Sequence, residues 1–163
     1  MVEESGVNRS SRLLEVGCGT GNYIIAVQFV SGCAARGVDI SEEMLVHAQR
    51  RDSPVEFSVG TAEFLEVADG SLDFIFTIDV VHHLGSPAEH YGEAYRALAP
   101  EGRICTVTHS EDMFRNTLVL AEYFPETRSE EHTSELQSRR NLTCRFILET
   151  KTTRHYLIHH HPH

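Results

Sequence analysis

The sequence predicts an α/β domain built on a doubly wound, mostly parallel sheet. Five short apolar runs of the kind that form buried strands occur between residues 13 and 108, and segments with helical spacing alternate with them. The first run ends in a glycine-rich turn that leads directly into a helical pattern. Parallel neighbours need crossover connections, and right-handed crossovers place helices on both faces of a sheet. This alternation therefore favours the doubly wound architecture.

The first unit is the stretch from Leu13 to Asn22, which reads Leu-Leu-Glu-Val-Gly-Cys-Gly-Thr-Gly-Asn. Its apolar start predicts a strand, its three alternate glycines predict a tight turn, and a helix is expected over Tyr23 to Val30. Glycine adopts positive φ and, because it lacks Cβ, lets a ligand lie against the backbone. A helix N-terminus also presents unpaired N–H groups to a polar or anionic ligand. Glycine-rich turns occur as purely structural βα connections too, so the turn by itself leaves both interpretations open.

Two further strands are expected in the first half of the chain. Gly32 is placed to end the first helix, and Ala34 to Ile40 predicts the second strand. Ser41 is the expected N-cap of a helix that runs to about Arg51. Val55 to Val59 then predicts the third strand.

The second half of the chain contains two more predicted strands. After a turn over residues 60–65, the run from Leu72 to Ile78 is almost continuous in β-branched and aromatic residues. Such a run suits a central strand that is covered on both faces. Arg103 to Thr108 predicts the fifth strand, and a further helix is expected over residues 111–124.

An amphipathic helix is expected between the fourth and fifth strands. Ser86 is its expected N-cap, and Pro87 suits the first helical position. Apolar residues recur at helical spacing, with polar Glu93 and Arg96 between them. Residues 99–102 predict the stop of this helix.

Two carboxylates flank the glycine turn in the sequence. Glu15 stands two residues before Gly17, and Asp39 lies at the end of the second predicted strand. In dinucleotide-type folds an acid at this place bonds ribose hydroxyls. The alternative is that both carboxylates only cap nearby backbone. The spacing G-x-G-x-G, rather than G-x-G-x-x-G, counts against a nicotinamide-dependent oxidoreductase.

These residues resemble the first motif of class I S-adenosylmethionine-dependent methyltransferases, which has an acid two residues before such a turn. The resemblance covers about Leu13 to Thr127, strand by strand, and the stretch from Asp79 to Leu84 looks like that of the quinone-biosynthesis-like small-molecule group. It implies a Rossmann-like methyltransferase fold, S-adenosylmethionine as cofactor and a small-molecule methyl acceptor. The family's seven-stranded sheet ends in an antiparallel hairpin. We do not find that hairpin here, so we expect five strands and a truncated domain.

The resemblance also implies which residues hold the cofactor. The glycine turn would give backbone contacts to the methionine part, Glu15 would orient its ammonium group, and Asp39 would hold the ribose. Ile40 would cover the adenine face. Thr61 stands where the family commonly has an adenine-binding acid, so the adenine contact is weakened. The full set is Glu15, Gly17, Cys18, Gly19, Gly21, Asp39, Ile40, Thr61, Ala62 and Asp79.

His82 and His83 are the candidates for a general base, because imidazole titrates near neutral pH and the pair follows the central strand. The alternative, which we favour, is a surface or structural pair. Asp79 is either a pocket residue or the cap of a turn, and we expect Cys18 to be a packing residue rather than a nucleophile. Methyl transfer from a sulfonium is an in-line displacement that mainly requires alignment, so no metal is expected. A non-catalytic nucleotide-binding remnant of the same fold is the alternative function.

Composition narrows the class of protein. A formal charge of -10 disfavours nucleic acid and anionic membrane as partners. The sequence contains no apolar run long enough to span a bilayer and no signal-peptide pattern at its start. The four cysteines are scattered, without a C-x-x-C pair, which favours reduced thiols and a cytoplasmic protein.

The last part of the chain differs in character from the rest. Residues 128–163 contain more basic than acidic residues, whereas residues 1–127 are strongly acidic. The stretch from Arg128 to Ser138 looks like one reading frame of a sequencing-adapter oligonucleotide. We therefore divide the chain into a disordered lead-in (1–12), a truncated S-adenosylmethionine-binding methyltransferase domain (13–127) and an artefactual tail (128–163).

Overall fold

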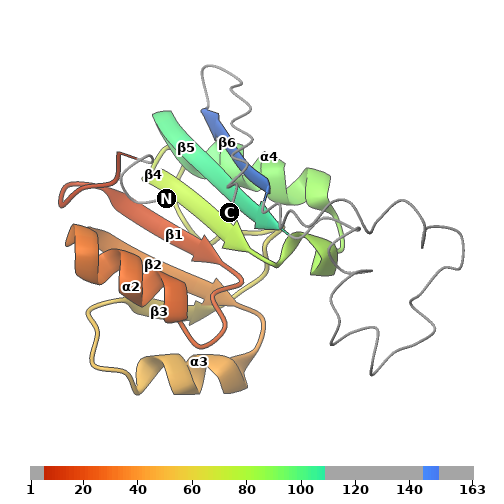
Figure 1. Ribbon diagram of the computed structural model, residues 1–163. Coiled ribbons are helices and arrows are strands. Elements are labelled where there is room, and N and C mark those ends of the chain that lie inside the picture. Colours follow the sequence, from red (N-terminus) through yellow and green to blue (C-terminus); the bar gives the residue numbers. More distant parts are fainter. Residues whose placement is uncertain (1–5, 109–144, 151–163) are drawn as a thin grey trace, which may run out of the picture.

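The structure is a computed structural model, and it describes residues 6–108 and 145–150 of the chain. Element labels are those of Figure 1. In chain order the elements are β1 (Arg12–Val16), α2 (Asn22–Ser31), β2 (Ala34–Asp39), α3 (Glu42–Gln49), β3 (Glu56–Val59), β4 (Leu72–Ile78), the 3₁₀ turn η1 (Val81–His83), α4 (Pro87–Ala97), β5 (Leu98–Thr108) and β6 (Arg145–Thr150).

The strands form one six-stranded sheet in the order β3-β2-β1-β4-β5-β6 (Figure 1). All pairs from β3 to β5 are parallel, which confirms the five predicted parallel strands. The chain proceeds from β1 outwards to β3 and then returns to β4 on the other side of β1. Ligands of open α/β sheets bind at the carboxyl ends of the strands where the order reverses in this way. Here the order reverses between β1 and β4.

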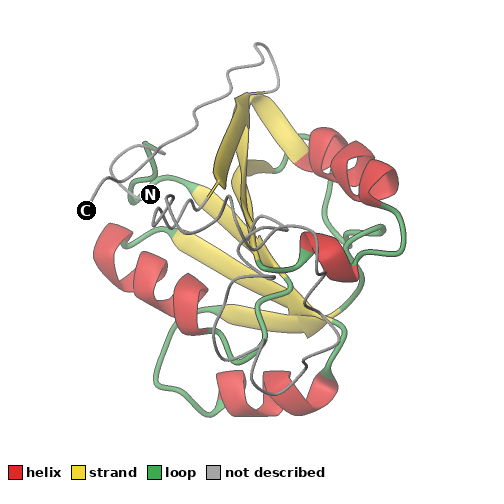
Figure 2. Ribbon diagram, turned by 45° about the vertical axis from the view of Figure 1, so that its right-hand side comes forward, coloured by secondary structure: helices red, strands yellow, loops and turns green. Residues whose placement is uncertain are grey.

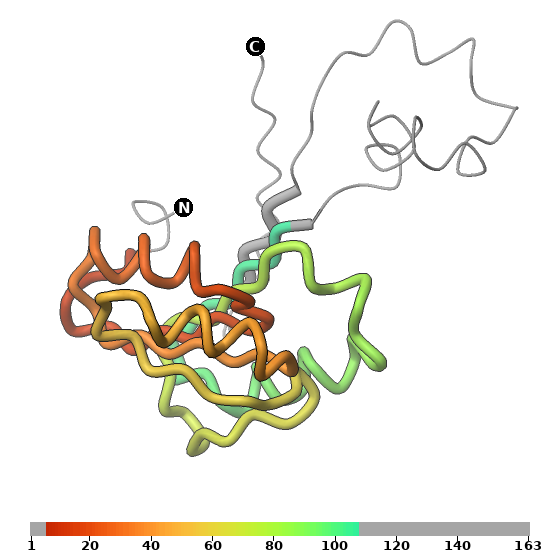
Figure 3. Tube along the Cα trace, turned by 90° about the horizontal axis from the view of Figure 1, so that it is seen from below, coloured from red at the N-terminus to blue at the C-terminus, as the bar shows by residue number. Residues whose placement is uncertain are grey.

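Each face of the sheet has its own core. One core joins β1 and β4 to α2 and α3 through Leu13, Phe76, Ile24 and Leu45 among others. The other joins the opposite face to α4 and to residues 62–67. Figure 2 shows the sheet between α2 and α3 on one side and α4 on the other, and Figure 3 shows the same separation from below. Right-handed crossovers that run in opposite directions from β1 require this division.

The predicted helix signals are confirmed. Ser41 Oγ accepts a hydrogen bond from the Met44 N–H at 3.3 Å, and Ser86 Oγ accepts one from the Glu89 N–H at 3.3 Å, so both serines are N-caps. Gly32 ends α2 in the left-handed region at φ +68°.

The helix α4 ends at Ala97, in agreement with the stop predicted at residues 99–102, but β5 begins at Leu98 rather than at the predicted Arg103. Leu98 already pairs with Leu72, and the register then shifts so that Arg103 pairs with Phe74. A Cβ on Gly102 would lie 2.9 Å from the Ala99 carbonyl oxygen, so the backbone folds closely on itself there. Residues 99–102 are therefore an irregularity within the strand, and not a turn before it.

One strand that sequence analysis did not find follows the fifth. β6 pairs with β5 in antiparallel register, from Arg103 opposite Thr150 to Thr108 opposite Arg145. β6 lies in the predicted tail, where Phe146 to Leu148 provides the β-branched and apolar residues that strands prefer. The open edge of β5 accepts such a segment whatever its origin. The predicted helix over residues 111–124 and most of the tail lie outside the described residues.

Residues 6–12 correct the predicted disordered lead-in. The Asn8 N–H donates to Ser11 Oγ at 3.0 Å, and the Ser11 N–H donates to the Asn8 carbonyl at 2.9 Å, which closes a turn. Arg12 already belongs to β1 and pairs with Asp73 of β4 at 2.8 Å. The polar composition that suggested disorder instead makes local hydrogen bonds.

None of the helices in the described part of the chain combines the length and the apolar character that crossing a bilayer requires.

Candidate functional site

The glycine turn lies at the carboxyl end of β1, where the strand order reverses. Gly17, Gly19 and Gly21 have φ values of +73°, +52° and +76°. All three are therefore in the left-handed region that residues with a Cβ rarely adopt. Gly21 is the N-cap of α2 and leaves that position without a side-chain cap. The alternate spacing of the glycines thus follows from the path of the backbone.

The protein's own side chains fill the space that two of these glycines leave. A Cβ on Gly17 would overlap with the Val80 side chain, which comes from the segment after β4. A Cβ on Gly21 would lie 2.8 Å from the Phe57 ring of β3. The turn is therefore packed between two neighbouring segments, and sequence analysis identified neither Val80 nor Phe57 as part of the site.

Glu15 is buried beneath the start of α2, with 1% of its surface exposed. Its Oε2 accepts a hydrogen bond from the Ile24 N–H at 2.9 Å. Burial raises the pKa of Glu15 to about 8, the hydrogen bond from Ile24 opposes this rise, and the charge of Asp39 adds to it. The carboxyl group consequently needs a cationic partner or a proton.

Asp39 connects the glycine turn to α3. Its Oδ2 accepts a hydrogen bond from the Gly19 N–H at 2.7 Å, and its Oδ1 accepts one from the Ser41 N–H at 2.9 Å. The Gly17 and Cys18 N–H groups in turn donate to the Val38 carbonyl at 2.8 and 3.1 Å. The turn is thus held from the end of β2, and both Glu15 and Asp39 make the backbone contacts of the capping alternative. Those contacts leave acceptor capacity on Asp39, and on Glu15 when a cationic partner keeps it ionised, because an ionised carboxylate has about four lone-pair sites.

Cys18 is a buried packing residue within the turn. Its Sγ lies 2.7 Å from the point where a Cβ on Gly37 would stand, so β2 has a glycine opposite it. Burial and the nearby carboxylates raise the pKa of the Cys18 thiol to about 12. A thiol held in this state is a poor nucleophile.

Exposed apolar side chains lie in the segments that follow the carboxyl ends of β2 and β3. Ile40 follows Asp39 and is 75% exposed, and Phe64 is 67% exposed. Met44 of α3 faces Gly19, with its sulfur 3.5 Å from the position of a Cβ on that glycine. Segments leaving the carboxyl ends of β2 and β3 thus present apolar surface, which is typical of a ligand site.

Thr61 and Ala62 lie in the segment after β3. Thr61 is exposed and forms an isolated bridge with Phe64. Ala62 is buried, and its carbonyl oxygen lies 3.2 Å from Nδ1 of His90 on α4. These two residues therefore belong to a segment that α4 holds, rather than to the glycine turn.

The segment after β4 begins beside the glycine turn and then moves out to the surface. Asp79 has a φ of +56°, which is uncommon for a residue with a side chain, and its N–H donates to the Val107 carbonyl at 2.9 Å. His82 and His83 are exposed in η1, with ring centroids 4.0 Å apart. Val80 packs against Gly17, so this segment contacts the turn just before the two histidines.

Arg51 is a further residue that sequence analysis missed. One of its Nη atoms donates to the Thr20 carbonyl at 3.3 Å and to Asn22 Oδ1 at 2.5 Å. It therefore holds the end of the glycine turn and the start of α2 from the far end of α3. No sequence pattern indicates this contact, because Arg51 lies 29 residues from Asn22 along the chain.

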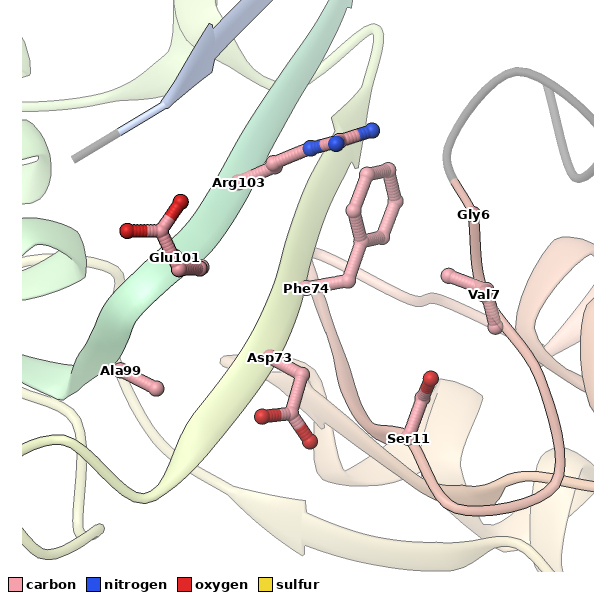
Figure 4. A pocket seen from close by; sticks show the side chains of 9 residues that line it. Gly6, Val7, Ser11, Asp73, Phe74, Ala99, Glu101 and Arg103 are labelled. Carbon is pink, nitrogen blue, oxygen red and sulfur yellow. The ribbon is translucent and has the colours of Figure 1, made fainter. Parts of the chain in front are cut away.

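A hollow of about 220 Å³ lies at the opposite ends of the strands, beside the starts of β4 and β5 (Figure 4). Val7 and Ser11 face Phe74 and Arg103 across it. Its Asp73 is already paired with Arg12. The hollow contains none of the residues expected to hold a cofactor, so we place the candidate site at the glycine turn, where the buried acid and the helix N-terminus meet.

A glycine turn at a topological switch point, with acids at the ends of two neighbouring strands, defines a doubly wound nucleoside-binding domain. Residues 14–106 match the model of the family described as methyltransferase domain. Because this match covers more than half of the chain, the chain belongs to this family, and the domain is a class I S-adenosylmethionine-dependent methyltransferase domain.

Individual relatives agree with this assignment. Phosphoethanolamine N-methyltransferase 2 of Caenorhabditis elegans is 26% identical over 69% of this chain and 28% of its own length. Demethylmenaquinone methyltransferase of Chlorobaculum parvum is 31% identical over 58% of this chain and 39% of its own length. The crystal structure of the Bacillus subtilis YcgJ protein superposes with a TM-score of 0.61 at 28% identity, over 67% of this chain and 48% of that one. The chain thus spans less than half the length of these proteins.

Proposed function

We propose that this domain binds S-adenosylmethionine at the glycine turn and transfers its methyl group to a small-molecule acceptor. The observation that supports this most is the turn itself, in which Asp39 holds Gly19 and a buried Glu15 lies under the start of α2. The two relatives described above are named for small acceptors of different chemistry, an amine and a quinone precursor. The proposal therefore extends to the class of small molecules and names no single acceptor.

Each residue has a role that its position supports. Glu15 offers a carboxylate to the ammonium group of the cofactor, and the backbone of Gly17 to Gly21 lies along the methionine part. Asp39 accepts hydrogen bonds from the ribose hydroxyls with the lone pairs that Gly19 and Ser41 leave. Ile40, which is exposed beside Asp39, covers one face of the adenine. Thr61 and the Ala62 N–H reach the adenine edge, and Asp79 lines the methionine end.

The transfer needs alignment more than it needs a reactive side chain. When bound, S-adenosylmethionine would supply an activated methyl carbon, to which the acceptor's nucleophilic atom would bond as the bond from carbon to sulfur breaks and a neutral thioether is released. An acceptor that carries a proton at that atom must lose it. His82 or His83 would take that proton if either serves as a base. If the pair is only a surface feature, the proton goes to solvent.

Binding of S-adenosylhomocysteine tests the cofactor assignment. Isothermal titration of the full chain with this compound is expected to show one saturable site. Replacing Asp39 with Ala should weaken binding by roughly 1 to 3 kcal/mol, the range for a hydrogen bond to a charged group. An unchanged affinity would remove Asp39 from the ribose site.

A double-mutant cycle distinguishes direct contact from loosening of the turn, because Asp39 also holds Gly19 and Ser41. The 2′-deoxy and 3′-deoxy analogues of S-adenosylhomocysteine each remove one of the two ribose hydroxyls. If Asp39 meets a hydroxyl, the analogue that lacks it should lose less affinity in the Asp39→Ala chain than in the native chain. Equal losses in both chains for both analogues would show that Asp39 acts only through the backbone.

The second candidate function is that of a remnant domain that binds the nucleotide but converts no substrate. It is favoured by the exposed position in η1 of His82 and His83, the candidates for a general base. A chain that binds S-adenosylhomocysteine but transfers no label from radioactive S-adenosylmethionine to a metabolite extract would support the remnant. Transfer of label to any small molecule in the extract would support the enzyme.

A further inference from the structure

The segment from residue 62 to residue 67 is held mainly by side chains of α4. His90, Glu93 and Arg96 stand three residues apart along this helix. His90 Nδ1 lies 3.2 Å from the Ala62 carbonyl oxygen, and Glu93 Oε2 accepts from the Leu65 N–H at 3.0 Å. Arg96 donates to the carbonyl groups of Leu65 and Val67 at 2.9 and 2.8 Å. Glu93 and Arg96, predicted as polar residues of an amphipathic helix, thus bind backbone.

This arrangement is firmly built. His90 is fully buried. Arg96 also pairs with Glu93 at 2.9 Å and with Asp69 at 2.7 Å. The segment therefore has a defined position relative to α4 although it contains no helix or strand of its own, and the candidate adenine contacts Thr61 and Ala62 share that position.

One residue of this segment, Glu63, in turn binds the backbone just before α4. Glu63 Oε1 accepts from the N–H groups of Gly85 and Ser86, at 3.1 and 3.4 Å. These two N–H groups lie at the start of α4, where the helix dipole also favours a carboxylate. Gly85 and Ser86 follow directly after the segment that carries His82 and His83. A single carboxylate oxygen thus joins the chain beside the candidate adenine site to the chain beyond β4.

We propose that Glu63 is a positioning residue that couples occupancy of the adenine site to the conformation of residues 79–86. The inference rests on the proposed function, because it requires a nucleoside at Thr61 and Ala62. A nucleoside bound there restrains Ala62, and Glu63 passes that restraint to Gly85 and Ser86. The segment that faces the methyl acceptor is then ordered when the methyl donor is present. The side chain of Glu63 is thus the link between the loop after β3 and the loop after β4.

Amide hydrogen exchange of the full chain, with and without S-adenosylhomocysteine, tests this coupling. In the native chain the compound should slow exchange both in residues 17–25 and in residues 82–86. In Glu63→Ala, protection of residues 17–25 should remain, whereas the added protection of residues 82–86 should fall by about tenfold, as expected when a hydrogen bond to a charged acceptor is lost. Glu63→Gln keeps an acceptor oxygen and should recover part of the protection.

Glu66→Ala is the matched control, because Glu66 is an exposed acid in the same segment. It should leave the ligand-induced protection of residues 82–86 as in the native chain. If residues 17–25 of the native chain gain no protection, the proposed function fails, and the coupling fails with it. If residues 17–25 are protected and residues 82–86 respond equally in the native chain and in both Glu63 variants, the coupling alone is overturned. Glu63→Gln decides the same question if the alanine variant does not fold.

Discussion

At the scale of single residues, the glycine turn shows two separate demands on one position. Gly17 has positive φ, and the side chain of Val80 occupies the space where a Cβ on Gly17 would lie. Gly70 has positive φ as well, at +63°, but a Cβ on it would meet no atom within 4 Å. Substituting Gly70 therefore adds only backbone strain, whereas substituting Gly17 adds backbone strain and overlap with Val80.

We expect Gly17→Ala to destabilise the protein more than Gly70→Ala. Both substitutions place Ala in the left-handed region, at about 1 to 2 kcal/mol, and overlap with Val80 adds about 1 to 3 kcal/mol at Gly17 alone. Urea unfolding measures both values. Adding Val80→Ala to Gly17→Ala should recover part of the loss, and equal losses at the two glycines would show that Val80 exerts no pressure on the turn.

Glu15 should make the stability of the protein depend on pH. Burial raises its pKa to about 8 in the folded chain, from an ordinary value of 4.5. Between these values the folded chain keeps a proton that the unfolded chain has lost, so the free energy of unfolding falls as the pH rises. The contribution of the neutral carboxyl is fully present below pH 4.5 and is lost as the pH passes through 8.

Urea unfolding at about pH 5, 7 and 9 checks this dependence. Glu15→Gln keeps an oxygen that can accept from Ile24 and has no proton to lose. Its stability relative to the native chain should therefore increase with pH. Glu43→Gln, at an exposed position in α3, controls for the loss of one acidic side chain. A difference between Glu15→Gln and the native chain that stays constant across this range would contradict the burial argument.

At the scale of elements, α4 contributes more than its apolar face. Ala94 and Ala97 pack on the sheet. The polar residues of the same helix bind the segment after β3, so that segment depends on a helix that follows it in sequence by about thirty residues. A helix can thus shape a neighbouring loop with the residues that periodicity assigns to its surface.

Arg96→Ala should cost about 1 to 2 kcal/mol of unfolding free energy, because it leaves the carbonyl groups of Leu65 and Val67 without this donor. Arg36→Ala is the comparison. Arg36 pairs with Glu56 at 2.9 Å, but both side chains are more than half exposed, so its loss should stay within about 0.5 kcal/mol. Chemical denaturation of the two variants measures the contrast. Similar small losses would mean that α4 holds the segment by packing alone.

At the scale of the whole molecule, β6 protects the edge of the sheet. β5 pairs with β4 on one side and with β6 on the other, so its backbone groups have partners along both edges. Without β6, the sheet would end in an open parallel edge at β5. An open parallel edge invites pairing with other chains, and β6 removes that edge here.

A chain shortened to residues 1–144 should aggregate, because it loses β6 and exposes β5. A chain shortened to residues 1–150 keeps the strand and is the matched control. Size-exclusion chromatography with light scattering compares them. A single monomeric species for residues 1–144, as sharp as that of residues 1–150, would show that β6 does not protect the edge.

Much of the fold could be predicted because its signals are local. The run from Leu72 to Ile78 is the strand β4 with the same bounds, and Ser41 and Ser86 are the N-caps that the sequence indicates. The positive φ of the alternate glycines also follows from the sequence, since no other residue type adopts that backbone easily. What failed was long-range pairing, at the start of β5 and at β6, because register depends on the partner strand.

By itself, the sequence determined the order of strands and helices, the glycine turn and the placement of Glu15 and Asp39 at the ends of neighbouring strands. These features follow from short-range periodicity and from the conformations that each residue allows. Only the tertiary structure decided that Val80 packs on Gly17, that Arg51 reaches Asn22 and that α4 holds residues 62–67. Such contacts join segments far apart along the chain, and their existence depends on the distances and orientations that packing of the sheet and helices sets.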